Sequence, residues 1–230
     1  MAVSAVIVAA GSSKRMDNGV DKLSVRVNGK PLIAWTISRF ESADSVDEII
    51  IVAREDSLGF VEEVVKGEGF GKINSVVAGG AHRQNSTENG IMALSRESEV
   101  VLIHDGARPL VHPSDIDSLT EDVYKHGASL LATKCNDTIK EVENGKIVKT
   151  IKRDSLWSAQ TPQGFRKDII AEALAKAERD GFIGTDEASL VERMNIEISV
   201  VEGRSDNIKV TVQEDLRLVE RYFMENAVDV

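Results

Sequence analysis

Residues 2–10 (AVSAVIVAA) and the loop residues 11–16 that follow them (GSSKRM) decide the fold of this chain. Residues 2–10 are rich in Val and Ile, which predicts a strand buried on both faces. Similar runs recur at residues 46–53, at 76–78 with their neighbours, at 100–104 and at 128–133. Segments of helical period separate them, at residues 31–41, 57–66, 84–94 and 114–125. This alternation predicts an α/β fold, in which a mostly parallel sheet carries helices on both faces.

The pattern changes after about residue 136, where two short strands, residues 138–143 and 146–151, flank Asn144 and Gly145. Asn-Gly favours a type I′ turn because both residues accept positive φ. The ribbon is rich in Lys and Glu and has no obvious helix to cover it, and an isolated two-stranded ribbon is marginal in water. We therefore expect residues 136–158 to form an arm that lies against a second subunit. A hairpin folded onto its own domain is the alternative.

Beyond the ribbon the pattern predicts five more elements. Helices are expected at residues 167–179 and 186–194, strands at 196–202 and 208–211, and a closing helix at 214–224. One apolar face of the closing helix carries Leu216, Val219, Tyr222 and Phe223. We therefore expect residues 1–230 to form a single domain with an inserted ribbon. His112 and Pro113 are typical of the start of the helix at residues 114–125.

The composition excludes several classes of protein. The 230 residues include 28 Lys+Arg and 38 Asp+Glu, a net charge of −10, and without a basic stripe this argues against a duplex nucleic-acid binder. No apolar run approaches the roughly 18 residues of a membrane span, and the first residues lack the basic region of a signal peptide. The single Cys135 excludes an internal disulfide framework and a Cys-based zinc site. We expect a cytoplasmic enzyme or binding protein.

The loop after the first strand is a candidate anion site, because ligands of open α/β sheets bind at the carboxyl ends of the strands. Small residues at Ala9, Ala10 and Gly11 let main-chain N–H groups approach an anion, and Arg15 and Lys22 add two cations. The loop suits a polyphosphate, although it is neither a Walker A loop nor a GxGxxG loop. Taken alone, a plain turn with surface cations explains it equally well.

Two further loops carry polar residues at strand ends. In HDGARP (residues 104–109), Asp105 is a candidate ligand of Mg²⁺ or of a ribose, and an ion pair with Arg108 that caps the strand is the alternative. In GGAHRQNS (residues 79–86), Arg83 and Ser86 lie in the first turn of a predicted helix, where the helix dipole favours anions. Ordinary turn chemistry is the alternative for the second loop.

The remaining candidates lie in the second half of the chain: Arg153, QTPQG (residues 160–164), TDEA (185–188) and DNIKVT (206–211). Lys209 is unusual because a strand between apolar neighbours rarely carries a Lys without a partner. The four histidines show no metal-ligand spacing and are expected to be solvated or hydrogen-bonded. Six cations at loop ends in a chain of net charge −10 indicate an anionic substrate, provided that the fold brings them together. They are Arg15, Lys22, Arg83, Arg108, Arg153 and Lys209.

These motifs occur in one order between residues 9 and 211, and together they resemble the 2-C-methyl-D-erythritol 4-phosphate cytidylyltransferase family of the non-mevalonate isoprenoid pathway. The resemblance implies a Rossmann-like nucleotidyltransferase fold and a homodimer with interlocking arms. It also implies a reaction in which CTP and a polyol phosphate give a CDP-alcohol and pyrophosphate, with Mg²⁺ or another divalent cation. Ribitol-5-phosphate cytidylyltransferase is similar through the first half, and a regulatory module that binds nucleotide without turnover is a further alternative.

The resemblance also implies roles for single residues. Those at the nucleotide would be Ala9, Ala10, Gly11, Gly80, Arg83, Ser86, Asp105 and Ala107, with Asp105 also near a Mg²⁺ held mainly by CTP. Catalysis would fall to Arg15, Lys22, Arg153 and Lys209. The second substrate would meet Arg108, Thr138, Arg153, Thr161, Thr185 and Lys209, with Thr138 and Arg153 reaching the partner subunit's substrate.

Two residues depart from the family pattern. Ser13 stands where the family usually has a second glycine, and Asp21 stands where a proline usually precedes the lysine. Ser13 is tolerable if its φ is negative. Asp21 places a carboxylate beside Lys22 and could loosen it. Neither change removes a charged group that the chemistry needs, so we expect activity.

Overall fold

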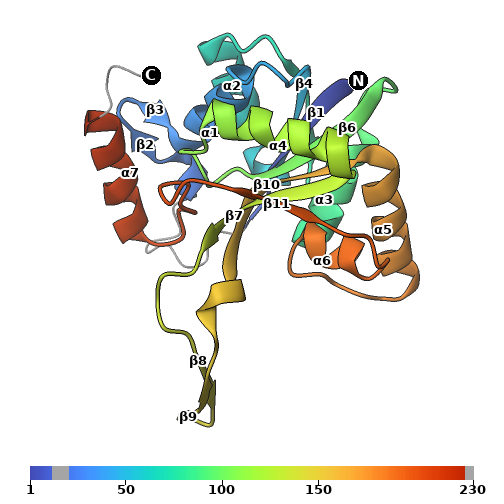
Figure 1. The fold of residues 1–230 in the computed structure, drawn as a ribbon. Helices are drawn as coiled ribbons and strands as arrows, with labels where there is room; N and C mark the ends of the chain where they lie inside the picture. The colour runs from blue at the N-terminus through green and yellow to red at the C-terminus, as the bar shows by residue number, and fades with distance from the viewer. Residues whose placement is uncertain (12–20, 226–230) are drawn as a thin grey trace.

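The computed structural model describes residues 1–11 and 21–225, which fold around a seven-stranded sheet (Figure 1). The strand order is β11-β7-β10-β6-β1-β4-β5. The strands are β1 (Ala2–Ala9), β4 (Glu48–Ala53), β5 (Ile73–Ala78), β6 (Ser98–Asp105), β7 (Ala128–Lys134), β10 (Trp157–Arg166) and β11 (Ser199–Glu202). All of them run in one direction except β10, which is antiparallel to β6 and β7. The predicted α/β class with a mostly parallel sheet is confirmed.

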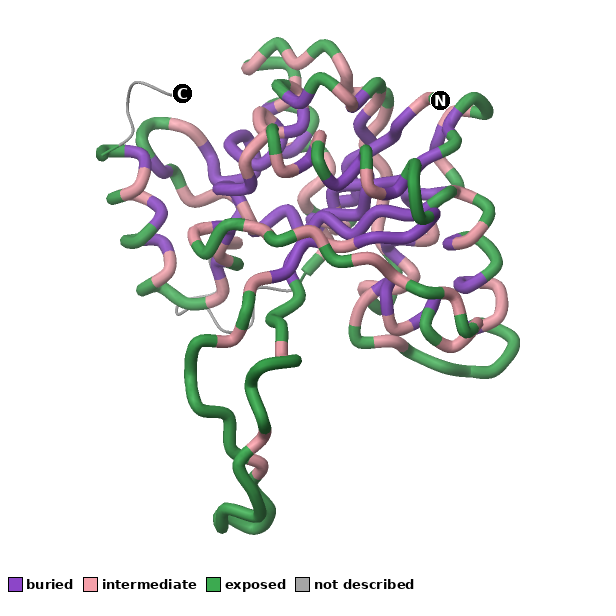
Figure 2. Tube along the Cα trace, in the orientation of Figure 1, coloured by how far each residue is buried: buried purple, intermediate pink, exposed green. Residues whose placement is uncertain are grey.

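Helices cover both faces of the sheet, as predicted. One face packs against α1 (Leu32–Glu41), α2 (Leu58–Glu68) and α4 (Pro113–His126), and α7 (Gln213–Glu225) joins the same core through Phe223, which stacks on Trp35 of α1. The other packs against α3 (Arg83–Met92), α5 (Lys167–Arg179) and α6 (Glu187–Glu192). Along β1, Ala5 and Ile7 join the first core and Val6 joins the second, so the strand is buried on both sides (Figure 2). Full burial of a Val or Ile side chain contributes about 1.5–3 kcal/mol to the stability of the fold.

The ends of α4 follow the sequence signals. His112 is the N-cap and its Nδ1 accepts a hydrogen bond from the Ser114 N–H at 3.2 Å, while Pro113 occupies the first turn. Gly127 ends the helix with φ of 84°, a left-handed conformation that other residues adopt at a cost. The predicted start of this helix at His112 is confirmed.

The ribbon consists of β8 (Lys140–Glu143) and β9 (Lys146–Thr150), and it protrudes from the body of the molecule (Figures 1 and 2). Asn144 and Gly145 have φ of 51° and 76°, as the predicted type I′ turn requires. Most of the arm is exposed, including the apolar side chains of Val142 (55%) and Ile147 (66%). The hairpin therefore does not fold back onto its own sheet, and its apolar side chains are left to be covered by something else.

One strand was missed, and one expected strand is absent. Strand β10 was not expected, because Pro162 and Gly164 interrupt it; its pairing with β7 shifts between Ala159 and Gln163, which leaves Pro162 outside the ladder. Residues 208–211 form no strand, and Val210 instead donates its N–H to the Ala107 carbonyl at 2.9 Å. The short elements β2 (Arg26–Val27), β3 (Lys30–Pro31), η2 (Lys22–Ser24), η3 (Glu55–Ser57) and η4 (Arg153–Ser155) were also not anticipated.

Within the part of the chain that the structure describes, no helix has both the length and the apolar character needed to cross a membrane.

Candidate functional site

A hollow of about 340 Å³ opens where β1 and β6 end side by side. All eight residues that the sequence assigns to the nucleotide line it, and Lys22 and Lys209 line it as well. The eight are Ala9, Ala10, Gly11, Gly80, Arg83, Ser86, Asp105 and Ala107. Residues from three separate loops thus meet at the carboxyl edge of the sheet, as the parallel arrangement requires.

The glycine turn before α3 packs too closely for a side chain at Gly80. A Cβ there would lie 2.4 Å from the Cβ of Asn85. The Gly80 N–H donates to Ser86 Oγ at 3.1 Å, and that hydroxyl donates to the His82 carbonyl at 3.1 Å. The Asn85 Oδ1 accepts the His82 N–H at 3.3 Å and closes the start of the helix. These bonds fix the backbone of the turn against the first hollow.

A second hollow of about 240 Å³ adjoins the first and shares Arg83, Asp105 and Lys209 with it. Its other lining residues are Arg108, Ala159, Gln160, Thr161, Gln163, Thr185 and Asp186, most of them on β10 or just before α6. The sequence assigns Arg108, Thr161, Thr185 and Lys209 to the second substrate, and the structure brings these four together. We call Arg83, Asp105 and Lys209 the shared wall.

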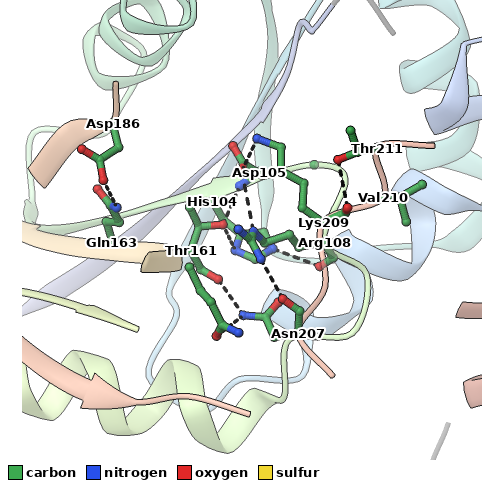
Figure 3. Close-up of polar contacts among 12 residues, drawn as sticks. His104, Asp105, Arg108, Thr161, Gln163, Asp186, Asn207, Lys209, Val210 and Thr211 are labelled. Carbon is green, nitrogen blue, oxygen red and sulfur yellow. Dashed lines mark hydrogen bonds and ion pairs between the residues drawn. The ribbon is translucent and has the colours of Figure 1, made fainter. Parts of the chain in front are cut away.

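Asp105 is the centre of the shared wall, and Figure 3 shows it beside Lys209 and Arg108. Its Oδ2 lies 2.8 Å from Lys209 Nζ and 3.7 Å from Arg108 Nε, and its Oδ1 lies 3.1 Å from Arg83 Nε. Burial by itself raises the pKa of Asp105, but the charges of Arg83 and Lys209 overcome this and hold the pKa well below its ordinary value. One ionised carboxylate therefore meets three cations. Among the residues that line the two hollows, the cations Lys22, Arg83, Arg108 and Lys209 outnumber the carboxylates Asp105 and Asp186, which suits an anionic ligand.

Lys22 also lines the first hollow. Its Nζ donates to the Val210 carbonyl at 2.7 Å, next to Lys209 in the chain. The preceding residue, Asp21, accepts the Leu23 N–H at 3.1 Å and caps η2. The carboxylate that departs from the family pattern thus stabilises the turn that carries Lys22, instead of loosening it.

Buried His104 joins the Asp105 loop to β10 (Figure 3). Burial lowers its pKa to about 3, so the ring is neutral. Thr161 Oγ1 accepts the Asp105 N–H at 3.1 Å and lies 3.1 Å from His104 Nδ1, while His104 Nε2 lies 3.1 Å from the Arg108 carbonyl. A proton on Nε2 satisfies every contact, since Thr161 then donates to Nδ1. The expectation of a hydrogen-bonded His104 is confirmed.

Asn207 attaches the segment that carries Lys209 to β10 (Figure 3). It is 1% exposed, and its side-chain amide donates to the Thr161 carbonyl at 2.9 Å and to Gln160 Oε1 at 3.1 Å. Its own carbonyl accepts from Arg108 Nη1 at 2.7 Å. The sequence analysis gave no role to Asn207 or Gln160, although both belong to candidate motifs, DNIKVT and QTPQG.

Two of the predicted site residues, Thr138 and Arg153, do not line either hollow in this chain. Arg15 lies outside the described residues. Thr138 and Arg153 are exposed on the arm, where Arg153 Nη1 donates to the Asn136 carbonyl at 2.7 Å. The proposed action of these two residues in a partner subunit therefore stays a prediction, as do the individual roles of the residues that line the hollows.

Comparison with known proteins identifies the family. The family model of 2-C-methyl-D-erythritol 4-phosphate cytidylyltransferase matches residues 3–225. This chain belongs to that family. The cytidylyltransferase of Geobacter metallireducens is 42% identical over 229 residues, which are 98% of this chain and 99% of that protein. The cytidylyltransferase of Bacillus licheniformis is 43% identical over 215 residues, 94% of this chain and 93% of that one.

Solved structures of cytidylyltransferases share the fold. The 4-diphosphocytidyl-2C-methyl-D-erythritol synthase of Anaerococcus prevotii superposes with a TM-score of 0.87 at 32% identity, covering 97% of this chain and 96% of that one. The 2-C-methyl-D-erythritol 4-phosphate cytidylyltransferase of Thermus thermophilus gives a TM-score of 0.78 at 28% identity, covering 96% and 98%. The Rossmann-like nucleotidyltransferase fold expected from the motifs is confirmed.

Proposed function

We propose that this protein condenses CTP with 2-C-methyl-D-erythritol 4-phosphate to give 4-diphosphocytidyl-2-C-methyl-D-erythritol and pyrophosphate. The observation that carries the proposal is the pair of adjoining hollows that share Arg83, Asp105 and Lys209. Two anionic substrates need two sites with one cationic boundary, and membership of the family supplies the identity of both substrates.

The first hollow would hold CTP. The turn at Gly80 offers main-chain groups to the nucleotide, and the loop at Ala9, Ala10 and Gly11 admits phosphates closely because its side chains are small. Lys22 would then leave the Val210 carbonyl for a phosphate oxygen. With Arg15, it would stabilise the charge that builds on the α-phosphoryl oxygens as pyrophosphate leaves.

The second hollow would hold the polyol phosphate. Lys209 and Arg108 would bind its phosphate, and Thr161 and Thr185 would line the polyol side. A phosphate oxygen attacks the α-phosphorus of CTP, a new P–O bond forms, and the bond to the β-phosphate breaks in line, so that pyrophosphate carries away the electron pair. The nucleophile is already an anion near neutral pH, so no general base is needed. The protein's contribution is alignment and charge.

The proposal includes Mg²⁺ or another divalent cation, which would screen the charge of the phosphates. Asp105 is the carboxylate among the described residues that line the first hollow, but both of its oxygens are already paired with Arg83, Lys209 and Arg108. No group of three or more His, Cys, Asp or Glu suited to a metal occurs among residues 1–11 and 21–225. The phosphate oxygens of CTP would therefore supply most of the ligands.

The proposal also includes a homodimer in which residues 136–158 of each subunit lie against the other. Support comes from the exposed apolar side chains of Val142, Ile147 and Val148 on a two-stranded ribbon, which gains stability only when covered. The partner subunit's Arg153 and the partner's Thr138 would then complete the second hollow. A cytoplasmic location belongs to the proposal as well, because a reaction that consumes CTP needs a compartment supplied with nucleoside triphosphates.

The proposed function is tested by measuring pyrophosphate release from CTP with two polyols side by side. Turnover with methylerythritol phosphate well above that with ribitol phosphate is the expected result. Preference for ribitol phosphate would identify the sibling activity, and CTP binding without turnover of either polyol would identify a regulatory module. Both of those outcomes contradict the proposal.

A further inference from the structure

Glu187, in the first turn of α6, is a buried carboxylate to which the reaction described above gives no role. It is 1% exposed. Its Oε1 accepts a hydrogen bond from Thr87 Oγ1 at 2.7 Å, and the same oxygen pairs with Arg83 Nη1. Its Oε2 is buried and has no hydrogen-bond partner among the described residues. A buried charge lowers the stability of the fold unless an ion pair and hydrogen bonds compensate for the lost hydration.

The partner of Glu187 is Arg83 of the shared wall. Arg83 Nε lies 3.1 Å from Asp105 Oδ1, so two carboxylates from different elements hold two different nitrogens, Nε and Nη1, of one guanidinium. Its Nη2 has no partner in residues 1–11 or 21–225, and the side chain is 29% exposed. Because a guanidinium is planar, fixing two of its nitrogens also fixes the direction of the third.

The position of Glu187 is itself fixed. Gln163 of β10, 1% exposed, donates to Asp186 Oδ2 at 2.8 Å and accepts the Ala188 N–H at 2.9 Å (Figure 3 shows the Gln163–Asp186 contact). The start of α6 is therefore attached to the sheet on both sides of Glu187. Burial by itself lowers the pKa of Arg83, but the charges of Glu187 and Asp105 overcome this and raise it, so Arg83 stays a cation.

Stability alone does not account for this arrangement. Replacing a buried ion pair by well-packed apolar side chains is often neutral or stabilising. What an apolar pair cannot do is hold a cation in one orientation at the boundary of two anion sites. Without Glu187, Arg83 would keep only its contact with Asp105 and could turn about it.

We propose that Glu187 is a positioning residue that acts through Arg83, holding the guanidinium so that Nη2 meets the phosphates of the bound substrates. Thr87 contributes to this positioning, since its hydroxyl donates a hydrogen bond to the Glu187 carboxylate. The inference rests on the proposed function, because it assigns Arg83 to that reaction. It adds a residue that touches no substrate, and it predicts how substitutions at Glu187 and Arg83 depend on each other.

A double-mutant cycle tests the proposal. Glu187→Gln keeps the shape of the side chain and removes its charge, and we expect kcat/KM to fall about tenfold to hundredfold. In an Arg83→Met background the same change should alter kcat/KM by less than about twofold, because the group that Glu187 positions is gone. An equal loss in both backgrounds would show that Glu187 acts independently of Arg83 and would overturn the proposal.

Two further variants keep the test decisive if Arg83→Met folds poorly. Thr87→Val removes the hydroxyl and leaves every charge in place; it should lower kcat/KM, and Thr87→Ser should recover most of the loss. The matched control is Glu192→Gln, the same change at an exposed position of α6, with an expected effect below about twofold. Melting temperatures of all variants are compared, and a loss of kcat/KM that merely follows the loss of stability would contradict positioning.

The failure of this inference differs from the failure of the proposed function. If the wild-type protein releases no pyrophosphate with either polyol, the proposed function fails. The cycle is then read from the Kd of CTP by calorimetry, where the same dependence of Glu187→Gln on Arg83 is expected, and additive effects on Kd would overturn the inference.

Discussion

Asp105 Oδ2 and Lys209 Nζ lie 2.8 Å apart, although one residue ends a central strand and the other belongs to a loop near the end of the chain. The contact depends on Asn207, which attaches that loop to β10, and on Thr161, which holds the backbone of Asp105. Lys209 is 39% exposed, so it can still reach a ligand while paired. The cationic boundary is thus present before any substrate binds.

Lys22→Ala should lower kcat at saturating CTP by about 10²–10³, roughly 3–4 kcal/mol of transition-state stabilisation, by analogy with deleting an oxyanion-hole donor. The reason is the loss of a cation beside the α-phosphate. Steady-state kinetics measures the effect, and Lys66→Ala, which removes a Lys on exposed α2 surface, serves as the control. A kcat within about twofold of wild type would remove Lys22 from the mechanism.

Mixing an Arg153→Ala subunit with a Lys22→Ala subunit should restore activity that neither homodimer has. If Arg153 acts across the interface, each mixed dimer contains one intact site. Random pairing of equal amounts should then recover about a quarter of wild-type activity, since half of the dimers are mixed and half of their sites are intact. Co-expression with two affinity tags isolates the mixed dimer, and an inactive mixed dimer would show that the site is not shared.

His104→Gln should flatten the dependence of stability on pH. The folded pKa of His104 is about 3, below the ordinary 6.5, so the unfolded chain binds a proton first as the pH falls. This contribution to the free energy of unfolding is complete above pH 6.5 and is lost toward pH 3, at up to about 1.4 kcal/mol per pH unit. Glutamine offers an NH2 donor group and a carbonyl acceptor but does not titrate. Denaturant unfolding between pH 4 and 6.5 compares the two slopes, and equal slopes would contradict a neutral, buried His104.

Gly80→Ala should destabilise the protein by about 1–3 kcal/mol and raise the KM for CTP, because the new Cβ would lie 2.4 Å from the Cβ of Asn85 and would displace the turn. The control is Gly59→Ala in α2, where a Cβ meets nothing within 4 Å. There the alanine should increase the free energy of unfolding by about 0.5–1 kcal/mol. Denaturant unfolding and CTP kinetics on both variants separate the two cases. Unchanged KM and stability in Gly80→Ala would refute the close packing.

Much of the fold could be predicted because its signals are local. The apolar run at β1 and the Asn144–Gly145 turn each determine their own conformation. Strand β10 could not be predicted in the same way, since Pro162 argues against a central strand and only the shift in its pairing with β7 makes room for it. At residues 208–211 the prediction was wrong in the opposite way, since a strand was expected and none forms. Val210 hydrogen-bonds to the loop at Ala107, and the apolar side chains of Ile208 and Val210 join the core that also contains α7.

In the candidate site, too, some features could be predicted from the sequence and others depend on tertiary structure. Ala9 to Gly11, Gly80 and Asp105 lie at the ends of predicted strands or just beyond them, so topology alone places them at one edge of the sheet. Glu187 belongs to the candidate motif TDEA, but the sequence gives it no role of its own, because only the packing of α6 against α3 makes it a buried partner of Arg83. Which cation meets which carboxylate is decided by tertiary structure, which the spacing of residues in a sequence does not encode.

The shared wall has a pharmacological consequence. Arg83, Asp105 and Lys209 border both hollows, so a compound with two anionic ends and a linker that spans the boundary would contact the same three side chains from either side. Binding of the first end would raise the local concentration of the second, and the tethered compound would bind more tightly than either fragment alone. A single compound with two linked anionic groups is thus the kind of inhibitor that fits this pair of hollows.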